Sequence, residues 1–267
     1  MITVAEACVL GAVQGLTEFL PVSSSGHLAV VHSMITPLPG AQTAAVDVVL
    51  HMGTLLAVVV YFRDDLAQLT RGLLGYGTGW QRAWVWLLLL ATLPGLVVGV
   101  LFQARLEASF HSLALVGVNF LATGTLLWVA THVPRAGRDE AGLGARDALV
   151  IGCFQAVALL PGISRSGSTV SAGLLCGLDH GVAARFAFLL GIPAIVGAQI
   201  SQLGTVVSLG SDALLPLAAG TIVAATVGLL AIALFMRLIR GGRLYYFAYY
   251  LWPLGLFVLA ASLSGRN

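Results

Sequence analysis

Two short polar segments interrupt an otherwise apolar chain, and each carries residues that could act on a phosphate. The first runs Gln14-Gly-Leu-Thr-Glu18-Phe-Leu-Pro-Val-Ser-Ser-Ser-Gly-His27, and the second runs Pro161-Gly-Ile-Ser-Arg-Ser-Gly-Ser-Thr169. The first supplies an acid, hydroxyls and an imidazole, and the second supplies a guanidinium. Polar groups at the depth of a bilayer are costly and are usually kept for function. This combination predicts chemistry on an anionic substrate.

Within the first segment, Glu18 follows Gln14 by one helical turn, so both side chains project from one face. A carboxylate beside an amide can hold a hard divalent cation, with water and a ligand's phosphate completing the shell. The alternative is a buried Glu that only pairs with Arg for packing. We predict Glu18 and Gln14 as the metal ligands.

The serine cluster that follows, Ser23, Ser24 and Ser25, is predicted to lie in a loop between two half-helices. Backbone amides there could hold an anion, and a hydroxyl, preferably that of Ser24, could attack phosphorus. His27 then serves either as the base for this attack or as the group that activates water, and the sequence leaves both routes open. For each serine alone, a helix-capping role is at least as good an interpretation.

Arg165 is the strongest single candidate, because its planar guanidinium suits phosphate oxygens. Pairing with Glu18 alone would be an expensive way to stabilise a membrane protein. We expect this guanidinium to point into the cavity that holds Glu18, Ser24 and His27. His51 is open between that cavity and a structural role. The candidates for substrate binding are Gln14, Ser23, Ser25, Ser164, Ser166 and Thr169.

The elements that position these residues must be membrane helices. The chain is 58% apolar and only 9% charged, against about 25% charged in soluble domains. The net charge of +2 argues against a nucleic-acid partner, which needs a basic face. Six apolar runs are long enough to span a bilayer of about 30 Å, at residues 44–62, 84–103, 113–132, 183–204, 213–236 and 244–263. The last of these carries no internal charge and is predicted to be purely structural, with its tyrosines in an interfacial belt.

Two further apolar stretches, 3–35 and 147–176, are broken near the middle by Pro and a Ser/Gly cluster. A continuous helix through 21–26 is unfavourable, and exposed irregular backbone is not tolerated in lipid. Both breaks therefore predict re-entrant helix–loop–helix hairpins. Gly11, Gln14, Ser23, Ser25 and Gly26 recur at one constant offset as Gly152, Gln155, Ser164, Ser166 and Gly167, which indicates an internal duplication.

Three spans separate the two copies, so the second copy is inverted relative to the first, as in many transporters. The expected fold is thus an all-α membrane protein of six transmembrane helices plus two hairpins in an inverted repeat. It forms one polytopic domain, 1–267, with halves at about 1–135 and 145–267. Three loops, 63–83, 133–146 and 237–243, each carry three Arg, and the opposite set is nearly free of cations. The positive-inside rule places the Arg-rich loops in the cytoplasm and the C-terminus outside.

The two polar segments resemble the signature motifs of the undecaprenyl-pyrophosphate phosphatase family, of the bacitracin-resistance type. The similarity extends over essentially the whole chain. It implies a multi-pass enzyme of the bacterial plasma membrane that hydrolyses undecaprenyl pyrophosphate to undecaprenyl phosphate and inorganic phosphate. This reaction recycles the lipid carrier for cell-wall synthesis and confers bacitracin resistance.

The resemblance also implies a need for Mg²⁺ or Ca²⁺ and an active site facing the outer side, and it leaves a homodimer open. Gln14 stands where the family's motif has Glu or Gln, so Glu18 is the sole acid of the motif in this chain. The main competing class is a polyprenyl-phosphate flippase or secondary transporter, which would share the inverted repeat and buried charges but break no bond.

Overall fold

The computed structural model describes residues 2–35, 40–77, 79–110, 112–133, 136–207 and 211–264. Within these residues the chain forms α-helices, one short 3-10 helix (η1) and a single isolated bridge between Arg138 and Leu178. The elements are α1 (Val4–Phe19), α2 (Ser24–Ile35), α3 (Gly40–Tyr61), α4 (Arg63–Leu73), α5 (Gly79–Leu101), α6 (Gln103–Ser109), α7 (Leu113–His132), α8 (Ala145–Val157), α9 (Arg165–Leu175), α10 (His180–Val207), η1 (Ser211–Ala213), α11 (Leu214–Arg240) and α12 (Tyr246–Leu263).

Six of the described helices, α3, α5, α7, α10, α11 and α12, are long and apolar enough to cross a membrane. They coincide with the six predicted spans and differ from them only by a few residues at the ends, as helix boundaries usually do. The all-α class and the number of spans are confirmed. The chain is a multi-pass membrane protein.

The two interrupted segments form the helix pairs α1–α2 and α8–α9. Each break lies where Pro21 or Pro161 was expected to place it, but the first is shorter than predicted. Helix α2 already begins at Ser24, and α9 begins at Arg165, so the residues expected in loops lie in first helical turns. The reason is that Ser at a helix N-terminus satisfies backbone N–H groups that would otherwise lack partners.

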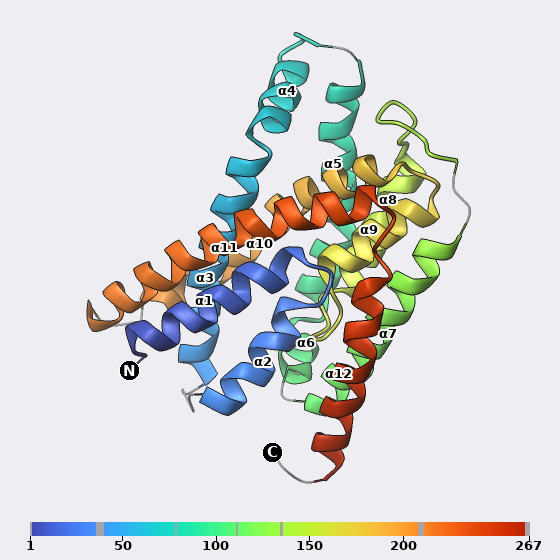
Figure 1. Ribbon diagram of the computed structural model, residues 1–267. Helices are drawn as coiled ribbons and strands as arrows, with labels where there is room; N and C mark the ends of the chain where they lie inside the picture. The colour runs from blue at the N-terminus through green and yellow to red at the C-terminus, as the bar shows by residue number, and fades with distance from the viewer. Residues whose placement is uncertain are drawn as a thin grey trace.

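The two helix pairs are held by close contacts with long helices of the other half of the chain. Helix α1 lies along α11 and α8 lies along α5, while α7 and α12 run side by side (Figure 1). A Cβ atom added to Gly11 would lie 2.2 Å from the Gly220 carbonyl oxygen, and one added to Gly152 would lie 2.4 Å from that of Ala91. These contacts are shorter than any side chain allows, so both positions require glycine.

Aromatic rings fill the core beneath the end of α1. The Phe188 ring on α10 contacts those of Phe19, Phe62 and Phe235, with centroid separations of 5.8, 5.6 and 5.3 Å. All four side chains are buried. Packing of this kind contributes both burial and edge-to-face ring contacts, and it fixes the end of α1 that carries Glu18.

An ion-pair cluster joins α10 to the start of α4 and to the segment 136–144 that precedes α8. The Arg185 guanidinium pairs with the carboxylates of Asp65 and Glu140, and it lies 5.7 Å from the Trp84 ring centroid. The Asp65 side chain is 19% exposed, and no spacing in the sequence indicates that Arg185 lies opposite it.

Candidate active site

Glu18 lies in the last turn of α1 and is the centre of the polar cluster. Its Oε2 atom accepts hydrogen bonds from Ser24 Oγ at 2.6 Å and from Gln14 Nε2 at 3.2 Å. Its Oε1 atom pairs with Arg165 Nη2 at 2.6 Å. The carboxylate side chain is 5% exposed, so these partners replace the water that burial removes.

The turn between α1 and α2 places the serines. Ser23 has φ +70°, a left-handed conformation that costs a residue with a side chain about 1–2 kcal/mol. Its Oγ atom accepts from Gly26 N at 3.3 Å and lies 3.3 Å from Ser25 Oγ. This cap turns the first residue of α2, Ser24, toward Glu18.

The turn between α8 and α9 repeats this arrangement. Ser164 Oγ accepts from Gly167 N at 3.1 Å and lies 3.2 Å from Ser166 Oγ. Ser164 therefore caps α9, and Arg165 becomes the first residue of that helix. The paired serines serve as caps in both turns, which was the alternative interpretation of the serine motifs.

The two turns lie against each other. Ser166 Oγ donates to the Leu20 carbonyl oxygen at 3.3 Å, and a Cβ atom on Gly167 would lie 3.2 Å from Pro21 Cβ. The two turns that carry the polar motifs are thus in direct contact. Arg165 Nη2 lies 2.6 Å from Glu18 Oε1, so no phosphate fits between these two groups. A phosphate must displace at least part of this ion pair.

Two polar residues on α7 hold the second turn, and sequence reasoning did not assign them to the site. Asn119 Nδ2 donates to the Pro161 carbonyl oxygen at 2.6 Å, and Thr123 Oγ1 donates to that of Gly162 at 3.2 Å. Thr123 Oγ1 also accepts from Ser164 N at 3.3 Å. The sequence feature that could have identified them is a pair of polar side chains one helical turn apart within an apolar span.

Arg165 has two neighbours that bear on the site, Gly191 on α10 and Thr169 on its own helix. Gly191 on α10 leaves the space that the guanidinium fills. Thr169, a predicted substrate-binding residue, donates its hydroxyl to the Arg165 carbonyl oxygen at 2.8 Å and is buried. Its hydroxyl therefore faces the helix backbone.

His27 lies in the first turn of α2 but is directed away from Glu18. Its Nδ1 atom lies 2.8 Å from the Ser23 carbonyl oxygen and its Nε2 atom lies 2.8 Å from the Tyr250 hydroxyl. A carbonyl only accepts, so Nδ1 carries a hydrogen, and in the neutral form of the ring Nε2 accepts from the Tyr250 hydroxyl. The final span, α12, was expected to be purely structural, but its Tyr250 hydroxyl is hydrogen-bonded to the candidate base His27.

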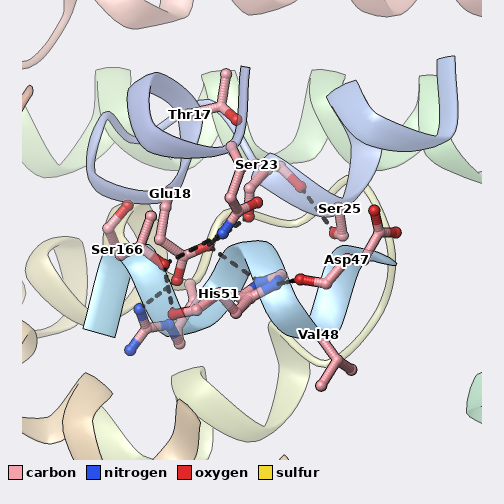
Figure 2. Close-up of polar contacts among 12 residues, drawn as sticks. Thr17, Glu18, Ser23, Ser25, Asp47, Val48, His51 and Ser166 are labelled. Carbon is pink, nitrogen blue, oxygen red and sulfur yellow. Dashed lines mark hydrogen bonds and ion pairs between the residues drawn. The ribbon is translucent and has the colours of Figure 1, made fainter. Parts of the chain in front are cut away.

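His51 on α3 takes the place beside Glu18 that His27 was expected to occupy. Its Nε2 atom lies 3.5 Å from Glu18 Oε2, and its Nδ1 atom lies 2.7 Å from the Asp47 carbonyl oxygen (Figure 2). Thr54, one turn further along α3, accepts from Gln14 Nε2 at 3.4 Å. The sequence left the role of His51 open, and its spacing from Thr54 was the only signal.

The cluster contains only a few oxygen atoms that could act as metal ligands, but their chemical type suits a hard cation. Glu18 supplies the carboxylate and Ser24 a hydroxyl, and Gln14 Oε1 is buried without a hydrogen-bond partner. The described residues contain no group of three or more His, Cys, Asp or Glu side chains that could hold a metal. A cation here fits only if the ligand's own oxygens complete the shell, as Mg²⁺ commonly allows.

Comparisons of the sequence with known proteins place the chain in one family. The family described as bacitracin resistance protein BacA matches residues 7–257. The undecaprenyl-diphosphatase of Alkaliphilus metalliredigens is 38% identical over 274 residues, which covers 98% of this chain and 99% of the relative. Those of Syntrophotalea carbinolica and Rubrobacter xylanophilus are each 42% identical and cover 96% and 98% of the chain, and 98% and 100% of their own lengths. The chain therefore belongs to the bacitracin resistance protein BacA family.

Proposed function

We propose that the chain is an undecaprenyl-diphosphatase, a membrane enzyme that releases inorganic phosphate from undecaprenyl pyrophosphate. Its full-length relatives carry that name. The observation that carries the proposal is the Glu18–Arg165 pair, where the two helix turns meet with the Ser24 hydroxyl on the same carboxylate. An acid, a nucleophile candidate and a phosphate-binding guanidinium lie together in one buried place.

The substrate's phosphates compete with Glu18 for the Arg165 guanidinium. A planar guanidinium binds two phosphate oxygens at once, which makes it a good partner for the charge that develops in the transition state. When Arg165 turns to the phosphate, Glu18 loses its ion-pair partner and becomes a stronger base. Binding of the substrate therefore prepares the carboxylate for proton transfer.

Two routes to hydrolysis are open in this geometry. In the first, Ser24 Oγ attacks the terminal phosphorus and passes its proton to Glu18, which already accepts its hydrogen bond at 2.6 Å. The bond from this phosphorus to the bridging oxygen breaks, undecaprenyl phosphate leaves, and water then hydrolyses the phosphoserine to inorganic phosphate. In the second, His27 activates a water molecule after Tyr250 releases its Nε2 atom. The first route uses the hydrogen bond between Ser24 and Glu18 that the structure contains, so we favour Ser24 as nucleophile.

A divalent cation, Mg²⁺ or Ca²⁺, would be held by Glu18 and Gln14 together with the pyrophosphate. It would neutralise phosphate charge at a site that offers a single acidic side chain. The remaining hydroxyls of the motif, those of Ser23, Ser25, Ser164 and Ser166, shape the two turns whose backbone surrounds the phosphates.

We also infer that α1–α2 and α8–α9 are re-entrant hairpins related by inversion. Helix α1 has 16 residues and is about 24 Å long, and the other three are shorter. None of them reaches across a hydrocarbon core of about 30 Å. The reciprocal packing of α1 on α11 and α8 on α5, and of α7 on α12, is what a two-fold relation between the halves requires. With the Arg-rich loops in the cytoplasm, the site opens to the outer side of the plasma membrane.

Release of inorganic phosphate from undecaprenyl pyrophosphate by the purified protein in detergent tests the function directly. We expect release with Mg²⁺ or Ca²⁺ and loss of release in EDTA. A lipid carrier that only moves the substrate across the membrane would release none, with or without metal.

A further inference from the structure

One face of α7 contacts both of the turns that carry the site residues. Phe120 is fully buried there, and a Cβ atom on Gly26, in the first turn of α2, would lie 2.6 Å from its ring. Asn119 and Thr123, on either side of Phe120, are hydrogen-bonded to the second turn. The Cβ atom on Gly26 would also lie 3.1 Å from the Cα atom of Gly162, so the two turns and α7 meet at one place.

The side chains of Asn119 and Thr123 hold three backbone groups of the second turn. The Asn119 amide donates to the Pro161 carbonyl oxygen at 2.6 Å. The Thr123 hydroxyl donates to the Gly162 carbonyl oxygen at 3.2 Å and accepts from the Ser164 N–H at 3.3 Å. Both side chains are buried. Backbone groups that lie outside a regular helix need partners of this kind within a membrane protein.

These hydrogen bonds end one residue before Arg165. Ser164 caps α9, and Arg165 follows it as the first residue of that helix, with Nη2 2.6 Å from Glu18 Oε1. Gly162 has φ +88°, and a Cβ atom there would lie 2.6 Å from the Val116 carbonyl oxygen. The backbone of the turn therefore approaches α7 as closely as a glycine permits. A shift of the turn away from α7 would carry the guanidinium with it.

Packing alone does not require two polar side chains on this face of α7. Val116 and Phe120 are fully buried on the same face and lie against the glycines of the two turns. Polar side chains within a transmembrane helix are costly and usually serve a function. What Asn119 and Thr123 do is fix irregular backbone, and the backbone that they fix is the segment that leads into Arg165.

We propose that Asn119 and Thr123 are positioning residues of the active site that act through Arg165. They hold the backbone of residues 161–164 against α7, so that the guanidinium and the Ser24 hydroxyl meet the same phosphate. The assignment rests on the proposed function, since it names what Arg165 is positioned for. Neither side chain contacts the substrate in this role.

The test removes the two side-chain contacts one at a time. Thr123→Val keeps the shape of the side chain without the hydroxyl, Thr123→Ser keeps the hydroxyl, and Asn119→Leu removes the amide. The matched control is Thr125→Val. It removes a different hydrogen bond between α7 and a neighbouring helix, the one that Thr125 accepts from Trp252 Nε1 at 3.2 Å.

Two quantities are measured on each variant. The first is kcat/KM for phosphate release from undecaprenyl pyrophosphate. The second is the dissociation constant of a prenyl methylenediphosphonate, which cannot be hydrolysed at the bridge. Binding of the diphosphonate is measured again with each change combined with Arg165→Ala, and the melting temperature of every variant is recorded.

We expect Thr123→Val and Asn119→Leu each to lower kcat/KM and to weaken diphosphonate binding by about 10-fold, since misplacement of a reacting group by about 1 Å is costly. Thr123→Ser should recover most of the loss, and Thr125→Val should match the wild type. Combined with Arg165→Ala, Thr123→Val should cause no further loss of binding, because the effects of residues that act through one another do not add.

Equal losses of binding with and without Arg165 would overturn the assignment. A lower melting temperature of Thr123→Val with unchanged diphosphonate binding would overturn it as well, because the contact would then serve stability alone. If the wild type released no phosphate, the proposed function would fail. The dependence of diphosphonate binding on both Thr123 and Arg165 would still decide the positioning role.

Discussion

A Cβ atom on Gly191 would lie 1.9 Å from Nη1 of Arg165. The guanidinium therefore occupies its position only because α10 has no side chain at this point. Two residues later, Pro193 lies inside the same helix. The position of the Arg165 guanidinium therefore depends on a glycine outside both motifs.

Gly191→Ala should displace the guanidinium and lower kcat/KM by on the order of 10-fold or more, since misplacement of about 1 Å at a reacting centre is costly. Gly197→Ala is the matched control, because a Cβ atom there has nothing within 4 Å and Gly197 lies on the same helix. Phosphate release by both variants checks the prediction. Equal activity of the two would show that Arg165 tolerates another position.

Removing either member of the central ion pair should abolish most activity. Glu18→Gln and Arg165→Ala are each expected to lower phosphate release by on the order of 10²-fold. Arg165→Lys should also fail, because a point charge replaces the two-pronged donor. The control is Arg63→Lys, at a side chain that is 71% exposed. Near-normal turnover in folded Glu18 or Arg165 variants would contradict the site assignment.

Ser24 attack predicts a covalent intermediate that the water route lacks. Incubation with substrate labelled in the terminal phosphate, followed by acid quench, should leave label on Ser24 of the wild type. Ser24→Ala should carry no label and should lose activity, because its hydroxyl is the one bonded to Glu18. Peptide mapping by mass spectrometry locates the phosphate. Full activity of Ser24→Ala would exclude Ser24 as the nucleophile and leave water activated by His27 as the remaining route.

Replacing Gln14 tests the proposed cation site. Gln14→Glu puts a second carboxylate one turn from Glu18, and carboxylates are preferred ligands of Mg²⁺ and Ca²⁺. We expect the Mg²⁺ concentration for half-maximal activity to fall, and EDTA to inhibit both proteins. A Mg²⁺ titration of phosphate release measures this shift. Activity that persists in EDTA would remove the cation from the mechanism.

The proposed orientation of the protein in the membrane can be tested with single cysteines, introduced into a variant that lacks the three native cysteines. Gly241 follows α11 in an Arg-rich loop, and Ala104 lies in α6 on the opposite side of the membrane by our assignment; both positions are exposed. An impermeant thiol reagent should label a cysteine at Ala104 in intact cells and spare one at Gly241. The reverse pattern would invert the topology and place the site at the cytoplasmic side.

The sequence by itself determined the class of the protein and the identity of its central residues. Apolar runs long enough to span a membrane are recognisable from the sequence, so the six spans were predictable. Pro next to Ser and Gly marked the positions where the two further apolar stretches are interrupted. Glu18 and Arg165 were recognisable because an isolated charge in an apolar segment has no structural reason to be there. The repeat of glycines and serines at a constant offset also pointed to two equivalent turns, and both turns make the same pair of serine contacts.

Only the tertiary structure decided which imidazole lies beside Glu18. His27 is close to Glu18 in the chain, but the cap at Ser23 and the hydroxyl of Tyr250 turn it toward α12. His51 is far from Glu18 in sequence and reaches it because α3 packs beside α1. The same holds for Asn119 and Thr123, which hold the second turn, and for Gly191, which admits Arg165. Spacing along the chain predicts contacts within one helix, whereas contacts between helices depend on how the helices pack, and no local pattern encodes that packing.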